Sequence, residues 1–265
     1  DVEGRRVDRA TSLANHLMHL RTANPGGEAG EVVGERVGSL RDVRVDASDG
    51  DRLPEGAFEQ NLQVGDAADF ESATSERLTR ADNASLSTGD IDFTFCLWVN
   101  AESFPTFATP LSKDDGVTQR EYGFYIDTAS NQLNFYVSSN GVATVEVGTT
   151  VLSTATWYFI VGWHDSVNNL IGIAVNAGTV ETLAHTTGVF DGTADFYIGG
   201  KADNALFWDG LIDQVGFWKR VLTSAERTQL YNNGNGLSYA AIQFLSLGMA
   251  TSSRQIRRGL GHRYI

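Results

Sequence analysis

The sequence predicts an all-β fold, a two-sheet antiparallel sandwich, and two observations support this prediction. Short segments rich in aromatic and β-branched residues recur along the middle of the chain, and their apolar and polar positions alternate as in strands. Clusters of Gly, Asn, Asp and Ser separate these segments at intervals of about ten residues, with no long helical pattern between them. Because parallel strands would need helical crossovers, we expect the strands to pair antiparallel.

The predicted strands follow one another with short turns between them. The clearest is 93–99, where Phe93, Phe95, Leu97 and Val99 share one face. In chain order, strand signals lie at 93–99, 121–127, 132–138, 144–147, 156–163, 170–175 and 195–198, and turn clusters lie at 128–131, 138–141, 164–169, 176–178 and 191–193.

One short helix is predicted over residues 224–231. Thr223 is a suitable N-cap residue, and Glu226 three positions later completes a capping box. Two asparagines and Gly234 follow directly and are expected to end the helix.

Composition and charge exclude several classes of protein. The chain has 265 residues and a net charge of -13, so nucleic acid is not its expected partner, because phosphate contacts need a basic surface. The longest apolar stretches, such as 157–163, are too short to span a bilayer, so no membrane span is expected. Cys96 is the single cysteine, which excludes an internal disulfide and a thiolate metal cluster; we expect a buried, inert thiol.

A motif near the C-terminus resembles a known family. Residues 208–234 contain a Gly-x-Ile-Asp strand at 210–213, then a Leu-Thr-x-x-Glu helix start and a Leu-Tyr-Asn ending. This order closely resembles the closing motif of laminin G-like domains, which belong to the concanavalin A-like lectin/glucanase superfamily. Segments 92–99 and 156–162 resemble core strands of the same family. The resemblance implies a two-sheet antiparallel jelly-roll sandwich with one short C-terminal helix and with its first and last strands paired.

The resemblance also divides the chain into parts. It is specific over residues 70–239 and weaker over 17–69, where a first strand and a long loop are expected. We therefore expect a polar N-terminal arm at 1–12, a laminin G-like domain at 13–239, and an apolar then basic C-terminal tail at 240–265.

The resemblance implies a protein that is not an enzyme, since most members of the family bind glycans or proteins. Its glucanases carry a Glu-x-Asp-x-x-Glu strand, and two carboxylates must converge for hydrolysis. No such triplet occurs here, because Glu121 and Asp127 are wrongly spaced and have no acid between them. Residues 112–119 resemble the Asp box of sialidases without its closing Trp, and we expect a hairpin turn there.

Calcium is the cofactor to consider. The resemblance implies one structural Ca²⁺ between an early loop and the Asp of the Gly-x-Ile-Asp strand, which is Asp213 in this chain. Gly38 stands in that loop where the family often has Asp, so Asp213 is either a calcium ligand or a residue that satisfies a turn. His16 and His19 have no third ligand beside them and are expected to be structural. No other cofactor is expected.

Two tyrosines are candidates for stacking on a sugar. If Leu133, Phe135 and Val137 face the core, Tyr136 points outward, and Tyr125 leaves the core face by the same alternation. The outer face of one sheet of such a sandwich is a groove where lectin-like ligands lie. We therefore name these two residues as carbohydrate-binding candidates.

The sequence thus predicts a non-catalytic structural or adhesion module. Segment 76–95 resembles the phage and environmental-bacterial branch of the family, which implies a virion surface protein, either a capsid decoration or a tail-associated protein. The alternative is a secreted bacterial lectin module that binds carbohydrate. Both interpretations place the chain on a virion surface or outside the cell, with a glycan as the ligand to test.

The C-terminal tail is the predicted docking element. Residues 240–265 contain no Asp or Glu, and 241–249 are apolar enough to need burial. The tail either packs on its own sandwich or docks on another virion or surface protein, including a second copy in a homo-oligomer. In the docking interpretation, the residues that meet carboxylates of the partner are Arg254, Arg257, Arg258 and Arg263.

Overall fold

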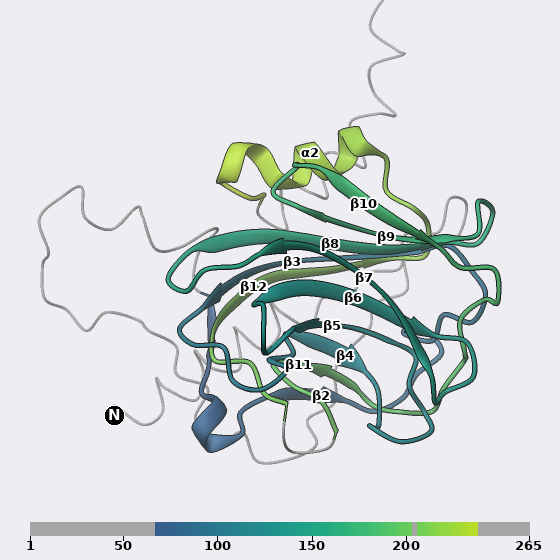
Figure 1. The fold of residues 1–265 in the computed structure, drawn as a ribbon, viewed down its shortest axis with the longest axis horizontal. Coiled ribbons are helices and arrows are strands. Elements are labelled where there is room, and N and C mark those ends of the chain that lie inside the picture. Colours follow the sequence, from purple (N-terminus) through teal and green to yellow (C-terminus); the bar gives the residue numbers. More distant parts are fainter. Residues whose placement is uncertain (1–66, 203–205, 238–265) are drawn as a thin grey trace, which may run out of the picture.

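The computed structural model describes residues 67–202 and 206–237, which form two β-sheets packed face to face (Figure 1). The strands are β1 (Ala68–Phe70), β2 (Leu78–Arg80), β3 (Phe93–Ala101), β4 (Leu111–Lys113), β5 (Tyr122–Ile126), β6 (Gln132–Ser138), β7 (Thr144–Val151), β8 (Trp157–Asp165), β9 (Leu170–Val175), β10 (Val180–Ala184), β11 (Phe196–Ile198) and β12 (Gly210–Trp218). The helical elements are η1 (Ser72–Thr74), α2 (Ser224–Tyr231) and η2 (Asn232–Gly234). In this described part, sheet A has the order β1-β12-β3-β8-β9-β10 and sheet B the order β2-β11-β4-β5-β6-β7.

The arrangement confirms the predicted jelly-roll sandwich. All strand pairs in the described residues are antiparallel, and β1, the first strand of the described part, pairs with β12, its last strand, with Phe70 opposite Gly210. The strand signals of the sequence become β3, β5, β6, β7, β8, β9 and β11, and the Gly-x-Ile-Asp motif opens β12. Strands β1, β2 and β4 are too short to show alternation, and β10 has no buried residue, so the sequence pattern did not predict these four.

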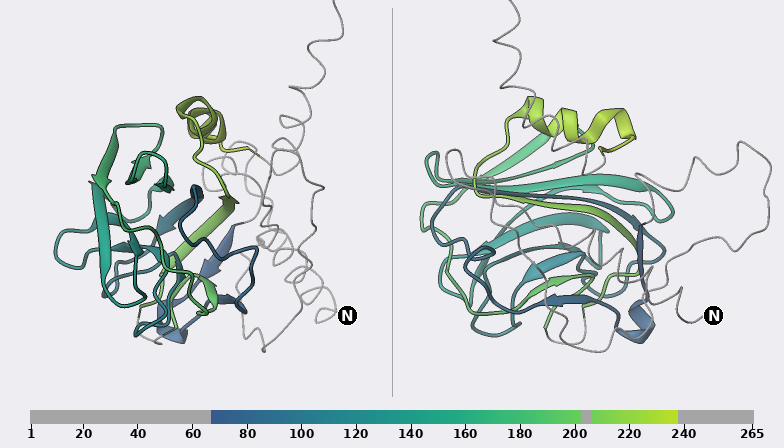
Figure 2. Two further views of the ribbon diagram at one scale, coloured as in Figure 1. Left: turned by 90° about the vertical axis from the view of Figure 1, so that its right-hand side faces the viewer. Right: turned by 180° about the vertical axis from the view of Figure 1, so that it is seen from behind.

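The main core lies between the sheets and is built of aromatic rings. Phe95 is at its centre, with its ring centroid 4.4 Å from that of Phe217 and 4.6 Å from that of Tyr122. A second cluster lies on the outer face of sheet A, where α2 covers it (Figure 2). There Tyr231 of α2 stacks on Trp98, with 5.7 Å between the ring centroids. Sheet A is therefore apolar on both faces.

The helix begins as predicted, with a capping box. The Thr223 hydroxyl accepts a hydrogen bond from the Glu226 backbone N–H at 3.2 Å, and the Glu226 carboxylate accepts one from the Thr223 backbone N–H at 2.8 Å. Asn232 adopts a left-handed conformation, with φ 47°, and ends the helix. The Arg220 guanidinium, paired with Glu226, lowers the pKa of that carboxyl to about 2.

A buried ion pair joins the loops at one end of sheet B. Lys113 and Glu121 have no exposed side-chain surface, and their Nζ and Oε2 atoms are 2.7 Å apart. Glu121 Oε1 also accepts hydrogen bonds from the backbone N–H and the hydroxyl of Thr88, and Oε2 accepts one from the Gly192 N–H. Lys113 Nζ lies 3.0 Å from an Asp82 carboxylate oxygen as well. The pair therefore fastens two loops to the core, the one between β2 and β3 and the one between β10 and β11.

Some predictions concern residues outside the described ranges. These are the N-terminal arm, the first strand of the family and the tail with its arginines. Within the described ranges, Cys96 is buried as predicted, and burial raises the pKa of its thiol. None of the helices described is long and apolar enough to cross a membrane.

Candidate functional site

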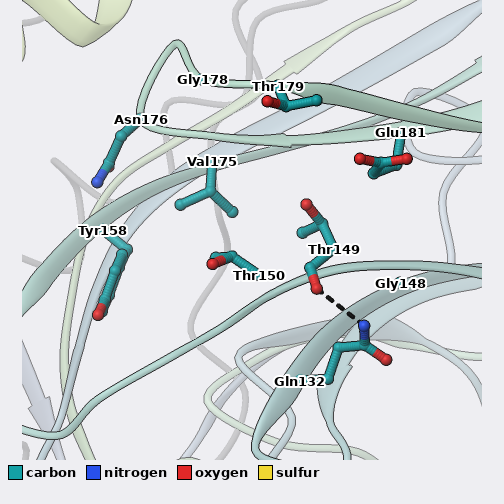
Figure 3. Close-up of a pocket in the computed structure, with 10 residues that line it drawn as sticks. All are labelled: Gln132, Gly148, Thr149, Thr150, Tyr158, Val175, Asn176, Gly178, Thr179 and Glu181. Atoms are coloured by element: carbon teal, nitrogen blue, oxygen red, sulfur yellow. Dashed lines mark hydrogen bonds between the residues drawn. The ribbon is translucent and has the colours of Figure 1, made fainter.

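A polar cleft of about 660 Å³ opens between β7, the edge strand of sheet B, and the β9–β10 hairpin at the edge of sheet A (Figure 3). We call it the edge cleft. Its volume falls within the range of small-molecule binding sites. It is lined by Gln132, Gly148, Thr149, Thr150, Tyr158, Val175, Asn176, Gly178, Thr179 and Glu181.

The edge cleft exists because the inner face of β10 is not covered by sheet B. Glu181 is paired across the strands with Ile173, and Leu183 with Ile171, so each pair shares one face of sheet A. Both isoleucines are fully buried in the core, whereas Leu183 is 42% exposed and Glu181 is also exposed. The inner face of β10 therefore lies across an open space from β7, the last strand of sheet B in the described chain.

Hydrogen bonds hold several polar groups of the lining in place. Gln132 Nε2 donates to the Thr149 carbonyl at 2.8 Å, as drawn in Figure 3. Asn176 Oδ1 accepts a hydrogen bond from the Phe159 N–H at 2.7 Å, which leaves its amide nitrogen for other partners. Tyr158 Oη accepts one from the Ser153 N–H at 3.1 Å. The amides and the phenol are thus oriented before any ligand arrives.

Other polar groups of the lining have no protein partner among the described residues. They are the hydroxyls of Thr149, Thr150 and Thr179 and the carboxylate of Glu181. Figure 3 shows the two threonines of β7 across the space from Thr179 and Glu181. Hydroxyls both donate and accept hydrogen bonds, and a carboxylate accepts them. The edge cleft can therefore satisfy a ligand that carries many hydroxyl groups.

Tyr136 points away from the core, as the alternation predicts, but it is only 6% exposed. Its ring lies over Gly123, and its hydroxyl is 2.8 Å from Asp114 Oδ2. Lys201 approaches the same Asp114 carboxylate oxygen at 3.0 Å. The outward direction of Tyr136 is confirmed, and the ring has little exposed surface because this polar cluster covers the outer face there. Little of the ring is left for a ligand.

Tyr125 is the more accessible of the two predicted tyrosines. It is partly exposed, and its ring makes an edge contact with that of Phe107, centroids 5.7 Å apart; Phe107 is 41% exposed. Burial, aided by the Glu146 carboxylate beside it, raises the pKa of Tyr125. This aromatic pair lies on the outer face of sheet B.

The tyrosine surface and the edge cleft are neighbours in sheet B. Tyr125 pairs with Asn134, and Asn134 pairs with Gly148, which lines the edge cleft. Residues paired in this way lie side by side on the same face. Alternation in the sequence indicates the tyrosine end of this row but not the edge cleft, because β10 shows no burial pattern.

Asp213 lies where β12 bulges and is 7% exposed. Its Oδ1 accepts a hydrogen bond from the backbone N–H of Gln214, 2.7 Å away, and Gln214 has a left-handed φ of 48°. Within residues 67–202 and 206–237, no group of three His, Cys, Asp or Glu side chains is placed to hold a metal. Gly38, which stands in the early loop where the family often has a calcium-binding Asp, is outside these ranges. The calcium role of Asp213 therefore stays a prediction.

The acidic motifs of the sequence have structural partners. In the segment that resembles an Asp box, Asp115 Oδ1 accepts hydrogen bonds from three backbone N–H groups, which confirms the predicted turn. Glu121 belongs to the buried ion pair, and Asp127 accepts hydrogen bonds from Ser130.

Two buried histidines meet at the end of the sandwich. The rings of His164 and His185 are 5.6 Å apart, edge to face. His164 Nδ1 lies 2.8 Å from the Ile91 carbonyl, which can only accept, so Nδ1 carries the proton. His164 Nε2 is buried without a hydrogen bond, 4.0 Å from a carboxylate oxygen of Asp90. Burial lowers the pKa of His164, and His185 beside it acts in the same direction.

This histidine predicts a pH dependence of stability. The pKa of His164 is lower in the folded protein than in the unfolded chain, so protonation favours unfolding. The stability that neutral His164 contributes is therefore lost as the pH falls below about 6.5. We expect thermal melting temperatures to fall between about pH 6.5 and 5, and His164→Asn to flatten that slope, since Asn keeps a donor for the Ile91 carbonyl. An identical slope in wild type and variant would contradict the assignment.

Comparisons with known proteins agree with the fold. Residues 73–226, more than half of the chain, match the family model described as the concanavalin A-like lectin/glucanases superfamily. The binding domain of Paraclostridial Mosquitocidal Protein 1 is similar with a TM-score of 0.52 and 14% identity, over 64% of this chain and 44% of that chain. The binding domain of botulinum neurotoxin serotype G is similar with a TM-score of 0.50 and 12% identity, over 63% of this chain and 43% of that chain. The match thus spans less than half of either solved chain. No curated protein sequence matches this chain significantly.

Proposed function

We propose that this chain, which belongs to the concanavalin A-like lectin/glucanases superfamily, is a non-catalytic module that binds carbohydrate in the edge cleft. The observation that carries the proposal is the lining of the edge cleft, where threonine hydroxyls, two carboxamides and a phenol meet. Sugars present hydroxyls at nearly every carbon, and each needs a donor or an acceptor when it leaves water. The lining supplies both kinds of group.

The partly exposed Tyr125 and Phe107 support the same ligand class. Aromatic rings bury the apolar C–H faces of sugars, and polar groups fix the orientation of the ligand. We infer that a sugar chain in the edge cleft continues across Gly148 toward Tyr125, because these residues share one row of sheet B.

The carboxylates of the edge cleft favour binding over hydrolysis. Glycoside hydrolysis by the usual route needs two carboxyl groups on either side of the scissile bond. The described lining contains one, Glu181. A single carboxylate can recognise a ligand but supplies only half of that acid–base machinery.

Filling the edge cleft should weaken binding. We expect Thr149→Trp to weaken binding of oligosaccharides selected on a glycan array by about tenfold or more, the factor that corresponds to ~1.4 kcal/mol of lost contacts. Titration calorimetry would measure it. Thr144→Trp is the matched control, because Thr144 is exposed on the same strand outside the edge cleft.

The variants also locate the ligand. If Tyr125→Ala weakens binding while Thr149→Trp does not, the ligand lies on the outer face of sheet B and the edge cleft is not the site. If no glycan binds the wild type, carbohydrate binding itself is wrong. Equal melting temperatures of the variants would show that folding is unaffected.

We further propose that the module acts on a virion surface or outside the cell. The resemblance of segment 76–95 to the phage and environmental-bacterial branch supports this, and the net charge of -13 disfavours a nucleic-acid partner. An antibody against the protein should label purified particles or the culture supernatant. Retention in the cytoplasmic fraction would contradict the proposal.

A further inference from the structure

We propose that Glu181 gives the edge cleft a charge preference, so that it selects saccharides that carry amino groups and rejects acidic ones. The inference rests on the proposed carbohydrate binding and names the class of sugar. Glu181 is exposed on β10, and within the described chain no hydrogen bond or ion pair engages its carboxylate.

The placement of Glu181 directs its charge into the edge cleft. Its strand partner Ile173 faces the core, so the Glu181 side chain lies on the inner face of sheet A, which is turned toward β7. Figure 3 shows the carboxylate on the same side of the space as Thr179 and across from Thr149. A ligand between β7 and β10 therefore meets this charge directly.

Nothing in the lining compensates this negative charge. The lining contains no Lys, Arg or His, and its other polar side chains are neutral. The protein as a whole carries a net charge of -13, which adds to the negative potential. A uronic or sialic acid would bring a second carboxylate into the edge cleft, where like charges repel.

A protonated sugar amine would have the opposite effect. An ammonium group can donate charge-assisted hydrogen bonds to the Glu181 carboxylate, which are shorter and stronger than those between neutral groups. The hydroxyls of Thr149 and Thr179 and the Asn176 amide would still serve the remaining sugar hydroxyls. The edge cleft thus fits a chain of β-linked or α-linked amino sugars better than its N-acetylated form, which has lost the charge.

The experiment compares three oligosaccharides of equal length: glucosamine tetramer, N-acetylglucosamine tetramer and tetragalacturonate. We expect the full chain to bind them in that order at low ionic strength, at a pH where the amine is protonated. The dissociation constant should rise about fivefold from each tetramer to the next, as for a partly exposed ion pair. This difference in affinity should decrease as salt is added.

Glu181→Gln should remove the preference while keeping a polar side chain of the same shape. The matched control is Glu71→Gln, because Glu71 adjoins β1 at the opposite edge of sheet A, so the net charge changes equally without touching the edge cleft. We expect Glu71→Gln to retain the wild-type order.

The outcomes separate the two proposals. If Glu181→Gln binds the three tetramers with the same ratio of affinities as the wild type, the charge preference is wrong and carbohydrate binding still holds. The same conclusion follows if Glu71→Gln changes the ratio as much as Glu181→Gln does. Binding of neutral sugars alone, insensitive to Glu181, would lead to the same conclusion. Absence of binding to any oligosaccharide would overturn both.

Discussion

Lys113→Met is expected to lower the free energy of unfolding by about 3–5 kcal/mol, the usual cost of removing one partner of a buried ion pair. Lys113 and Glu121 have no exposed side-chain surface, and their charged atoms are 2.7 Å apart. Without the lysine, the Glu121 carboxylate would stay buried beside Thr88 and Gly192, where hydrogen bonds stabilise it but no Lys113 ammonium balances its charge. Urea denaturation would measure the loss.

The loss of stability in Lys113→Met should depend on pH, because it comes from the buried charge of Glu121. Burial already raises the pKa of Glu121 above its usual value, although Lys113 opposes the shift. In Lys113→Met the carboxyl should be protonated more readily in the folded state, so the variant should lose less stability at pH 5 than at pH 8. The double variant Lys113→Met/Glu121→Gln should regain part of the loss, since it removes the buried charge.

A surface lysine provides the control for this experiment. Lys219 donates one hydrogen bond to the Ala84 carbonyl at the surface, so Lys219→Met should cost about 1 kcal/mol or less. If Lys113→Met is as mild as Lys219→Met at every pH, the ion pair does not fasten the loops to the core.

Phe95→Ala is expected to destabilise the protein by about 3–5 kcal/mol through the cavity that it leaves. Phe95 is fully buried, and its ring contacts Phe217 of β12 and Tyr122 of β5, one from each sheet. Because aromatic partners on both sides are held by their own strands, the cavity can collapse only in part. The chemical-denaturation midpoint would fall with an unchanged slope.

Phe107 is the matched control for Phe95. It is 41% exposed, so Phe107→Ala removes a ring that contributes little to the core and should cost much less. Equal losses at the two positions would contradict the placement of the core between β3, β5 and β12.

The strongest sequence patterns concern residues that are close along the chain. Strand β3 was predicted because its apolar positions alternate, and α2 because Thr223 and Glu226 are three residues apart. Both features are set by the backbone geometry of one element. The family motif at 210–213 identified β12 in the same local way.

The candidate site depends on contacts between distant segments. The sequence predicted the outward direction of Tyr136, but its burial depends on Asp114 and Lys201, which lie on other segments. The ion pair of Lys113 and Glu121 was missed for the same reason, since nothing in either segment marks the charges as buried.

The sequence by itself determined the all-β class, most of the strands, the helix with its cap and the family, because period-two alternation and capping are local properties of the backbone. The existence of the edge cleft, by contrast, is determined only by the tertiary structure. Its walls come from β7 of one sheet and from the β9–β10 hairpin of the other, and Glu181 faces a ligand only because sheet B ends at β7 in the described chain. How far one sheet extends over another follows from the packing of both, which no single strand encodes.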